Sequence, residues 1–306
     1  MSYSKVQKPS DYSELLYSAK FISNEEINTV LHLAVNLPKP VFIEGPVGSG
    51  KTFLAKAFAE ATKRKLIRLQ CYEGLDESKT IYEWEYSKQL LFTQMLKDKI
   101  DKLTFKAKNI EEAISILSKE KGFFSEDFLV TRPVLEAIKG GEKTVLLIDE
   151  IDKADAEFEA FLLEVLSEFS ISIPEIGTIR AVSKPIIFLT SNNSREISDA
   201  LKRRCLYLYM DIPDREMTRK IILAHIPNIK ERLILQVLDS VDNIRKLRLN
   251  RQPSVGEIID WVKSLIILSA DDISKDLFIK TMTTLIKEQN DILLVKKSID
   301  SIIKGI

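Results

Sequence analysis

The stretch Val41–Thr52, VFIEGPVGSGKT, decides the fold of this chain. Its last eight residues match the phosphate-loop pattern G-x-x-x-x-G-K-[ST]. Residues of strand-like character precede the pattern, and apolar residues recur after it at helical spacing from Phe53 to Ala61. The motif requires this strand–loop–helix context, which a chance glycine-rich turn would lack. The stretch therefore predicts a binding site for a nucleoside triphosphate.

Each residue type in this loop suits a polyphosphate. The glycines let backbone N–H groups turn inward where a β-carbon would obstruct the approach, and the following helix presents its free N–H groups to the same anion. We expect Lys51 to contact the β- and γ-phosphates and the Thr52 hydroxyl to ligate Mg²⁺. The predicted nucleotide-binding residues are Gly45, Pro46, Val47, Gly48, Ser49, Gly50, Lys51, Thr52 and Phe53.

A second half of the predicted site follows two further apolar runs. Thr144–Asp149, TVLLID, ends in an acid, as expected for a parallel strand that is buried on both faces. Ligands of open α/β sheets bind at the carboxyl edge of the strands, so we expect Asp149 to hold Mg²⁺ and Glu150 to activate the attacking water as a general base. Asn192 follows the run PIIFLT and could hydrogen-bond the same water. A plain turn residue is an equal alternative, and Asn193 competes for the role.

The periodicity of the chain predicts an α/β core followed by an all-α region. Strands that alternate with helices specify a doubly wound parallel sheet. The predicted strands are Val41–Glu44, Leu66–Gln70, Thr144–Asp149, Pro185–Thr190 and Cys205–Met210, with a β-hairpin of Phe169–Ile173 and Thr178–Val182. The predicted helices are Tyr12–Lys20, Ser23–Leu37 with a capping box of Ser23 and Glu26, Ala154–Phe169, Arg215–His225, Lys230–Leu247, Ser254–Ser269 and Asp271–Lys304, the last as one or two helices.

The segment between Lys51 and Asp149 is longer than one helix and one strand need. Ser78–Phe105 and Ile110–Lys121 have helical periodicity, which predicts a helical insert at about residues 76–127, and Phe128–Lys139 is predicted as a return helix. The aromatic residues at 82, 84 and 86 could form a partner surface or an extended segment packed on the core, and we favour packing. We expect a nucleotide-binding core at residues 1–211 and a helical lid domain at residues 212–306.

Composition narrows the function classes. The 306-residue chain has 45 basic and 45 acidic side chains, so it offers no net field for gripping a nucleic-acid backbone. Cys71 and Cys205 are too few and too far apart in sequence for a disulfide framework, which favours a reduced, cytoplasmic setting. The sequence has no apolar signal core and no run of membrane-spanning length. Nucleic acid is therefore not an expected partner, and no membrane span is expected.

The order of the motifs resembles the AAA+ ATPases, namely a phosphate loop, LLIDEID, a hairpin, FLTSN, an arginine cluster and a helical lid. Longer stretches are similar to the MoxR family of these ATPases, and specifically to its CoxD-like branch. These stretches are LQCYEGLD, YEWEYSKQLL, LLIDEIDKADAEFEAFLLEVLSEFSISIPEIGTI, LTSNNSREISDALKRRCLY and PSVGEIIDW. The resemblance covers roughly Lys20 to Leu265 and rests on long motifs.

The resemblance implies roles for residues that the local sequence alone does not assign. By itself, Lys202–Arg204 is a solvated charge cluster. The resemblance makes Arg204, with Arg203 as the competing candidate, an arginine finger that reaches the nucleotide of a neighbouring subunit, and it makes Asn192 the first sensor. Many family members also have a second-sensor arginine at the start of the lid's third helix. Here the arginine, Arg251, precedes the proline, so it would act from the preceding loop, or the lid would sense nucleotide differently.

The resemblance also implies an assembly and a client. Family members form rings, usually hexamers, and often act as chaperone-like factors beside a von Willebrand A-domain protein. The CoxD-like branch assists maturation of a molybdenum hydroxylase. The motifs predict Mg²⁺-dependent ATP hydrolysis, and the resemblance implies that this hydrolysis remodels or matures a protein client. Two alternatives from other classes are a slow nucleotide-gated assembly switch, which an intact Glu150 and Asn192 argue against, and a nucleic-acid motor or loader, which the neutral charge argues against.

Overall fold

A parallel β-sheet organises the N-terminal two thirds of the molecule. The structure, a computed structural model, describes residues 6–75, 77–95, 128–174 and 176–303. The sheet has five strands in the order β2-β5-β8-β1-β9, and every neighbouring pair runs parallel. The strands are β1 (Val41–Glu44), β2 (Lys65–Gln70), β5 (Thr144–Asp149), β8 (Ile186–Ser191) and β9 (Leu206–Tyr209). All five predicted strands are confirmed, and so is the α/β fold class with a phosphate-loop core.

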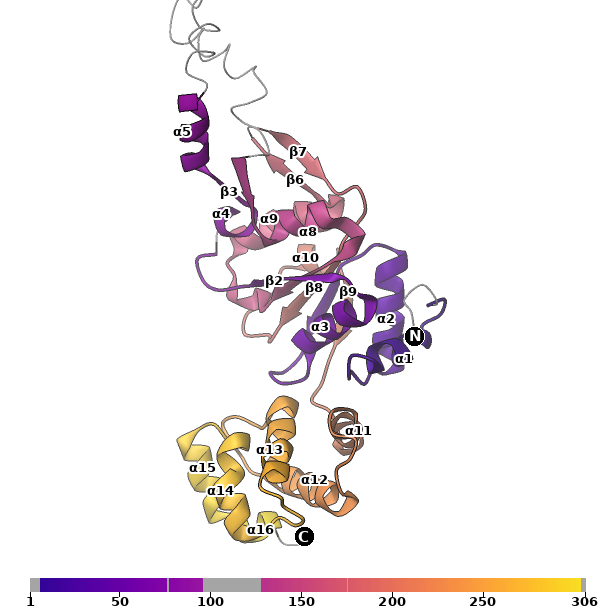
Figure 1. The fold of residues 1–306 in the computed structure, drawn as a ribbon, viewed down its shortest axis with the longest axis vertical. Coiled ribbons are helices and arrows are strands. Elements are labelled where there is room, and N and C mark those ends of the chain that lie inside the picture. Colours follow the sequence, from indigo (N-terminus) through magenta and orange to yellow (C-terminus); the bar gives the residue numbers. More distant parts are fainter. Residues whose placement is uncertain (1–5, 76, 96–127, 175, 304–306) are drawn as a thin grey trace, which may run out of the picture.

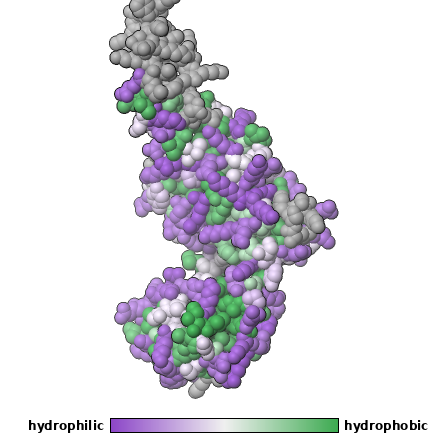
Figure 2. Space-filling view, in the orientation of Figure 1, coloured by the Kyte–Doolittle hydropathy of each residue, from purple (hydrophilic) through white to green (hydrophobic). Residues whose placement is uncertain are grey.

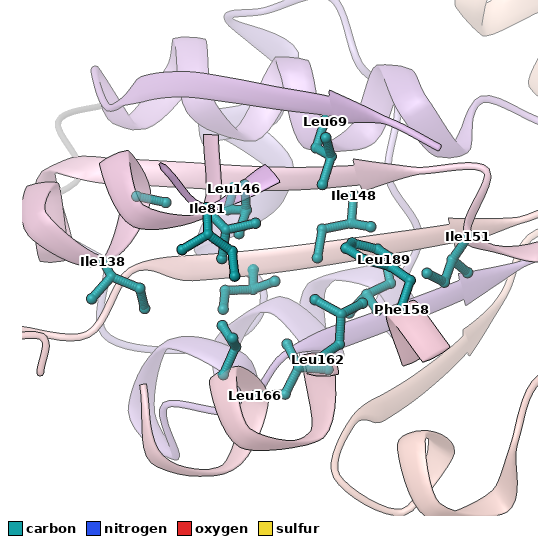
Figure 3. Packing of buried hydrophobic residues seen from close by; sticks show 14 of the residues in the cluster. Leu69, Ile81, Ile138, Leu146, Ile148, Ile151, Phe158, Leu162, Leu166 and Leu189 are labelled. Atoms are coloured by element: carbon teal, nitrogen blue, oxygen red, sulfur yellow. The ribbon is translucent and has the colours of Figure 1, made fainter. Parts of the chain in front are cut away.

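Helices cover both faces of this sheet, because side chains along each strand point alternately to opposite sides. All six residues of β5 are buried. Leu146 and Ile148 join one apolar cluster with Leu162 and Leu166, whereas Val145 and Leu147 join a second cluster. Figure 3 shows the first cluster between the sheet and the helix that contains Leu162 and Leu166. The first face is covered by α8 (Pro133–Gly140) and α9 (Ala156–Glu168), and the second by α1 (Asp11–Tyr17), α2 (Glu25–Asn36) and α3 (Lys51–Thr62).

The strand order brings the predicted site residues to one edge. In β1, Glu44 is in register with Ser191 of β8 on one side and with Tyr209 of β9 on the other. In β2, Gln70 is in register with Asp149. Since parallel strands end together, the phosphate loop after β1, the acids after β5 and the asparagines after β8 all leave the sheet at the same edge.

One predicted helix start is displaced by one residue. The N-cap of α2 is Asn24, whose Oδ1 accepts a hydrogen bond from the backbone N of Ile27 at 2.9 Å. The predicted capping box of Ser23 and Glu26 is therefore wrong, and the Ser23 hydroxyl has no hydrogen-bond partner. Asparagine and serine cap helices about equally well, so two adjacent capping residues leave the choice to the backbone path that precedes the helix.

The insert begins differently from the prediction. In its described part, the predicted helix Ser78–Phe105 is helical in α4 (Glu77–Thr80) and α5 (Tyr86–Met95). It is wrong between them, where β3 (Tyr82–Trp84) is a strand. The predicted return helix Phe128–Lys139 is wrong at its start, because β4 (Leu129–Thr131) pairs antiparallel with β3 before α8 begins at Pro133. Proline suits the first position of a helix, where no N–H partner is needed. The predicted helix Ile110–Lys121 lies outside the described residues.

The aromatic residues of the insert divide between core and surface. The side chains of Tyr82 and Trp84 are partly buried and pack against the first apolar cluster, and their rings meet edge-on at 6.1 Å. Tyr86 is exposed. The prediction of an extended segment packed on the core is therefore confirmed for the first two residues. Their spacing of two is the strand period, which overrides the weaker helical periodicity around them.

The predicted helix and hairpin after β5 are confirmed. The helix α9 is capped by Asp155, whose side chain accepts from Phe158 N. The hairpin consists of β6 (Ser170–Ile173) and β7 (Gly177–Arg180), which pair antiparallel. A short helix, α10 (Asp199–Lys202), then precedes β9.

The chain after β9 is helical throughout its described part. The helices are α11 (Arg215–His225), α12 (Glu231–Arg245), α13 (Val255–Ile267), α14 (Lys275–Leu285), α15 (Gln289–Lys297) and α16 (Ile299–Ile303). They share an apolar cluster of their own around the fully buried Trp261, and Figure 1 shows them as a separate group below the sheet. The predicted helix Asp271–Lys304 is three helices, because Ser274 caps a new start and Ile286–Glu288 is extended. A domain boundary at residue 212 stays a prediction.

The surface in this view differs between the two groups. Hydrophilic residues dominate over the sheet, and hydrophobic residues gather toward the middle of the C-terminal helices (Figure 2). Within the described ranges, no helix combines the length and the apolar character that crossing a bilayer would need.

Candidate functional site

The phosphate loop is held by two close backbone approaches. Gly45 has φ 155°, and a β-carbon there would lie 2.0 Å from the carbonyl oxygen of Met210. Gly48 has φ 86°, and a β-carbon there would lie 2.6 Å from Cβ of Ser254, the N-cap residue of α13. Glycine is therefore required at both positions by space, and at Gly48 also by backbone conformation. The second approach brings a C-terminal helix into direct contact with the loop.

The predicted phosphate-binding lysine is buried beside its own loop. Lys51 is 6% exposed, and its Nζ donates to the carbonyl oxygens of Gly45 at 2.7 Å and Pro46 at 2.8 Å. Burial lowers the pKa of Lys51, and the carboxylates of Asp152, Asp149 and Glu150 oppose that shift. The ammonium group thus lies at the start of α3, between the loop and the acids.

Asp149 is 1% exposed, and protein donors contact both of its carboxylate oxygens. Its Oδ1 accepts from the hydroxyls of Thr52 at 2.8 Å and Thr190 at 2.6 Å. Its Oδ2 accepts from Nε of Arg68 at 3.0 Å and from Nη2 at 2.6 Å. A buried carboxylate requires such partners, because an unpaired buried charge is costly. Asp149 and Thr52 therefore meet as the sequence predicts, with Arg68 as a partner that the sequence analysis missed.

Glu150 is held beside the same edge by three side chains. Its Oε1 accepts from Nδ2 of Asn192 at 3.3 Å, and its Oε2 accepts from Nε2 of Gln70 at 2.9 Å and pairs with Nζ of Lys153 at 2.5 Å. The residue itself adopts the left-handed conformation with φ 57°. A non-glycine residue in that region is strained, and such residues concentrate at functional sites. The structure thus brings the two predicted acids and Asn192 together.

Asn192 and Asn193 occupy different surroundings. The backbone N of Asn192 donates to Asp152, and its side chain reaches Glu150. Asn193 has φ 58°, and its N–H donates to the hydroxyl of Ser191. Burial would raise the pKa of Asp152, but hydrogen bonds from Ser194 and Asn192 outweigh burial and lower it. The carboxylate of Asp152 therefore holds the turn at residues 192–194 by hydrogen bonds, and in this turn the side chain of Asn192 contacts Glu150.

The three predicted arginines lie away from these acids within the chain. Arg204 donates through Nε to Ser167 Oγ at 2.5 Å and through Nη1 to the carbonyl oxygen of Ala200 at 2.8 Å. Arg203 is exposed, and its side chain has no hydrogen-bond or ion-pair partner among the described residues. Arg251 pairs with Glu257 at 3.2 Å. No contact within this single chain brings any of the three to Asp149 or Glu150, as far as the described residues show.

A cavity of about 680 Å³ connects the loop to the C-terminal helices. It is lined by residues 47–53 of the loop and α3, by both acids and by Asn192. Its other wall includes Ser254, the N-cap residue of α13, and Val255, Gly256 and Lys263 of α13, together with residues of α11. Gly45, Pro46, Arg203, Arg204 and Arg251 do not line it. Most of the predicted nucleotide-binding residues therefore line one side of the cavity. The residues on its other side were not predicted to bind nucleotide.

An aromatic group lines the apolar end of this cavity. The ring of Phe53 lies 5.9 Å from that of Phe21, in the segment before α2, and 6.0 Å from that of His225 on α11. Met217 and Ile221 line the same region. Flat, apolar walls suit a nucleobase, whereas the loop end suits phosphates. Phe53 is the one member of this group that the sequence analysis assigned, since the other members belong to segments that only the fold brings together.

His225, which contacts Phe53 of α3, is expected to make the stability of the protein depend on pH. Burial lowers the pKa of His225, and the positive charges of Lys20 and Lys263 lower it further. The unfolded chain then binds a proton at His225 more tightly than the folded protein does. The free energy of unfolding therefore falls as pH drops below about 6.5, the ordinary pKa of histidine, and continues to fall until the pH reaches the lowered pKa of the folded protein. We expect the midpoint of thermal unfolding to fall between pH 7 and pH 5, and to fall less in a His225→Phe variant. Parallel profiles for the two proteins would contradict this expectation.

Comparisons with known proteins agree with this geometry. A model of the AAA domain family, dynein-related subfamily, matches residues 40–205, which is more than half of the chain. The gas vesicle ATPase GvpN of Haloferax mediterranei is 24% identical over 301 residues, which cover 93% of this chain and 80% of that protein. An uncharacterized protein of Staphylococcus haemolyticus is 23% identical over 258 residues, which cover 81% of this chain and 83% of that protein.

The Holliday junction branch migration motor RuvB of Thermotoga maritima matches with a TM-score of 0.46 and 17% identity, over 92% of this chain and 76% of that chain. The match of residues 40–205 spans the phosphate loop, both acids and Asn192. The chain belongs to the AAA domain family, dynein-related subfamily, and is an AAA+ ATPase of the MoxR type.

Proposed function

We propose that this ATPase depends on Mg²⁺ and uses hydrolysis to remodel or mature a protein client. The observation that supports the proposed site is the meeting, at one cavity, of the phosphate loop, the Thr52–Asp149 pair and a glutamate beside Asn192. Phosphoryl transfer needs positioning and charge neutralisation more than covalent chemistry, and these groups supply both. The rings of Phe53 and His225 also line the cavity and offer aromatic walls to the base.

The donor set fits Mg²⁺. Thr52 commits its hydroxyl proton to Asp149, so the lone pairs of its oxygen remain for a cation, and Asp149 adds a carboxylate nearby. Mg²⁺ usually takes one or two such oxygen ligands and completes its shell with water and substrate phosphates. When bound, the ion would neutralise charge on the β- and γ-phosphate oxygens. Lys51 and the loop N–H groups would hold the same phosphates.

We assign the water-activating role to Glu150 and the orienting role to Asn192. A general base must lie within hydrogen-bond reach of the proton that it removes. Asn192 donates to Glu150, so the amide can hold the carboxylate and, through its oxygen, a water molecule between them. We assign Arg204 to the site of a neighbouring subunit, with Arg203 as the alternative, since the AAA+ family suggests ring assembly. Its two hydrogen bonds within the chain would hold the guanidinium in place for that task.

The number of subunits and the client are inferred from the motifs alone. A hexamer, a von Willebrand A-domain partner, a molybdenum hydroxylase client, the CoxD-like branch and a cytoplasmic location all rest on the resemblance or on composition. The role of Arg251 as a second sensor is also proposed on that basis, and its ion pair with Glu257 would have to open for it to contact phosphate. Neutral net charge continues to speak against a nucleic-acid motor.

The proposed function is tested by ATP turnover per subunit across a dilution series, with and without Mg²⁺. If each site is completed by a neighbour, we expect specific activity to fall on dilution, because the assembly dissociates. Chelation of Mg²⁺ should abolish turnover. Specific activity that is independent of protein concentration would contradict a site shared between subunits. Salt-sensitive stimulation of turnover by DNA would favour a nucleic-acid motor. Negligible turnover under all conditions would favour the assembly switch.

A further inference from the structure

Arg68 occupies a position that neither the motifs nor the family match assigns. It comes from β2, the strand at the edge of the sheet, and lies in register with Leu147 of β5. From there its guanidinium reaches the carboxylate of Asp149 with two nitrogens, at 2.6 Å and 3.0 Å. The side chain of Arg68 is 44% exposed, whereas that of Asp149 is 2% exposed. The arginine therefore extends from solvent toward a buried acid.

The two oxygens of Asp149 have separate partners. Oδ1 is shared by the hydroxyls of Thr52 and Thr190, which orient the carboxylate from two sides. Oδ2 has Arg68 as its partner, through both of the nitrogens already described. The two threonines therefore hold Oδ1 without help from Arg68, and Arg68 holds Oδ2. What Arg68 adds is a permanent positive charge at the second oxygen.

A cation bound beside Thr52 would compete with that charge. Both Mg²⁺, directly or through its water shell, and a guanidinium seek the lone pairs of the same carboxylate. Two positive charges a few ångströms apart also repel each other strongly in a partly buried site. We propose that Arg68 is a positioning residue that competes with Mg²⁺ for Asp149 and thereby raises the Mg²⁺ concentration that nucleotide binding requires. The inference rests on the proposed Mg²⁺ site at Thr52 and Asp149.

The contacts of Arg68 extend the effect to the second acid. Nη2 of Arg68 also donates to Oε1 of Gln70 at 2.5 Å, and Nε2 of Gln70 donates to Glu150 at 2.9 Å. Arg68 and Gln70 lie two residues apart on one face of β2, so a displacement of the guanidinium removes one of the hydrogen bonds that hold Gln70. Through Arg68 and Gln70, binding of the metal at Asp149 is thus linked to the hydrogen bond that Gln70 donates to Glu150.

The test is the Mg²⁺ dependence of thermal stabilisation by ADP, which reports binding and does not require turnover. We measure the unfolding midpoint at fixed ADP over a Mg²⁺ titration, for the wild type and for Arg68→Gln. Ligand binding to the folded state raises the midpoint according to its occupancy. We expect half-maximal stabilisation of Arg68→Gln at about tenfold lower Mg²⁺, which corresponds to about 1.4 kcal/mol. We also expect its metal-free midpoint to fall and to recover on addition of Mg²⁺.

Two further variants distinguish competition between Arg68 and Mg²⁺ from a general effect of removing a positive charge and from a failure to fold. Lys65→Gln removes a cation from the other end of β2, where Lys65 pairs with Glu136, and should leave the Mg²⁺ midpoint unchanged. Arg68→Lys keeps the charge and should give an intermediate value, because one ammonium cannot contact Oδ2 with two nitrogens. It also serves as the test variant if Arg68→Gln does not fold.

The outcomes distinguish this inference from the proposed function. If Mg²⁺ does not affect ADP stabilisation of the wild type, the proposed metal site fails. If the wild type responds but Arg68→Gln requires the same Mg²⁺ or more, the competition is overturned while the metal site stands. A loss of stability in Arg68→Gln that Mg²⁺ restores no better than in the wild type would likewise overturn it, because it would show a purely structural arginine.

Discussion

Replacing Glu150 with glutamine should lower ATP turnover by about 10²–10⁴-fold, the usual contribution of a general base. The amide has the shape of the carboxylate, and its single oxygen can still accept a hydrogen bond from either Gln70 or Asn192. It cannot take a proton from water, and it loses the ion pair with Lys153. Nucleotide affinity should stay close to that of the wild type, since the phosphate loop and Asp149 are untouched. Phosphate release and equilibrium binding of labelled ATP measure the two properties separately.

The matched control for this variant is Glu157→Gln. Glu157 is an exposed acid in the first turn of α9, so the same chemical change is made on the surface and away from the cavity. It should leave turnover unchanged. If Glu150→Gln retained wild-type turnover, Glu150 would not be the base. A loss of turnover together with an equal loss of ATP binding would instead assign it a role in binding the nucleotide.

Replacing Arg204 with alanine should lower turnover by about 10³–10⁵-fold, as expected of an arginine that stabilises charge on the transferred phosphoryl group. Arg204 does not line the cavity of its own chain, and its guanidinium is oriented by Ser167 and Ala200. Its proposed target is therefore the site of a neighbour. Nη2 has no partner among the described residues and is free to contact phosphate there.

Mixing two inactive proteins provides the decisive measurement. An Arg204→Ala subunit keeps its own Glu150, and a Glu150→Gln subunit keeps its own Arg204, so assembly of the two should create sites with both groups. Turnover of the mixture should exceed that of either protein alone. Arg203→Ala, in the adjacent position, is the control and should be close to the wild type. No recovery on mixing would contradict a finger supplied in trans, and loss of activity only in Arg203→Ala would transfer the role to Arg203.

The sequence predicted the sheet and the acidic edge of the site well, for physical reasons. Four apolar residues in a row precede the acid in the run TVLLID, and such a run is typical of a strand that is buried on both faces. The phosphate loop carries its own geometry, because its glycines match a conformation that other residues cannot adopt. Such local features survive in any tertiary setting, so Lys51, Thr52, Asp149 and Glu150 were recognisable without the fold.

The missed parts depend on contacts between distant segments. Arg68 and Gln70 alternate with the buried Ile67 and Leu69 in the edge strand β2. The target of Arg68 became visible only when β2 was placed beside β5. Similarly, Ser254 lies in the stretch PSVGEIIDW, but its contact with the phosphate loop arises from the packing of α13 and could not be read from that stretch. The local errors occurred where two neighbouring residues suit the same role almost equally well, such as Ser23 and Asn24 as the N-cap of α2.

The cavity wall has a consequence for the order of events during synthesis. The phosphate loop ends at Thr52, whereas the opposite wall is completed by Ser254 and Lys263, about two hundred residues later. At the ordinary pace of translation, about 5–20 residues per second, roughly 10–40 s separate the emergence of the two halves. A nascent chain therefore carries a finished loop with only half of its binding site. The complete binding site can therefore form only after α13 has been synthesised.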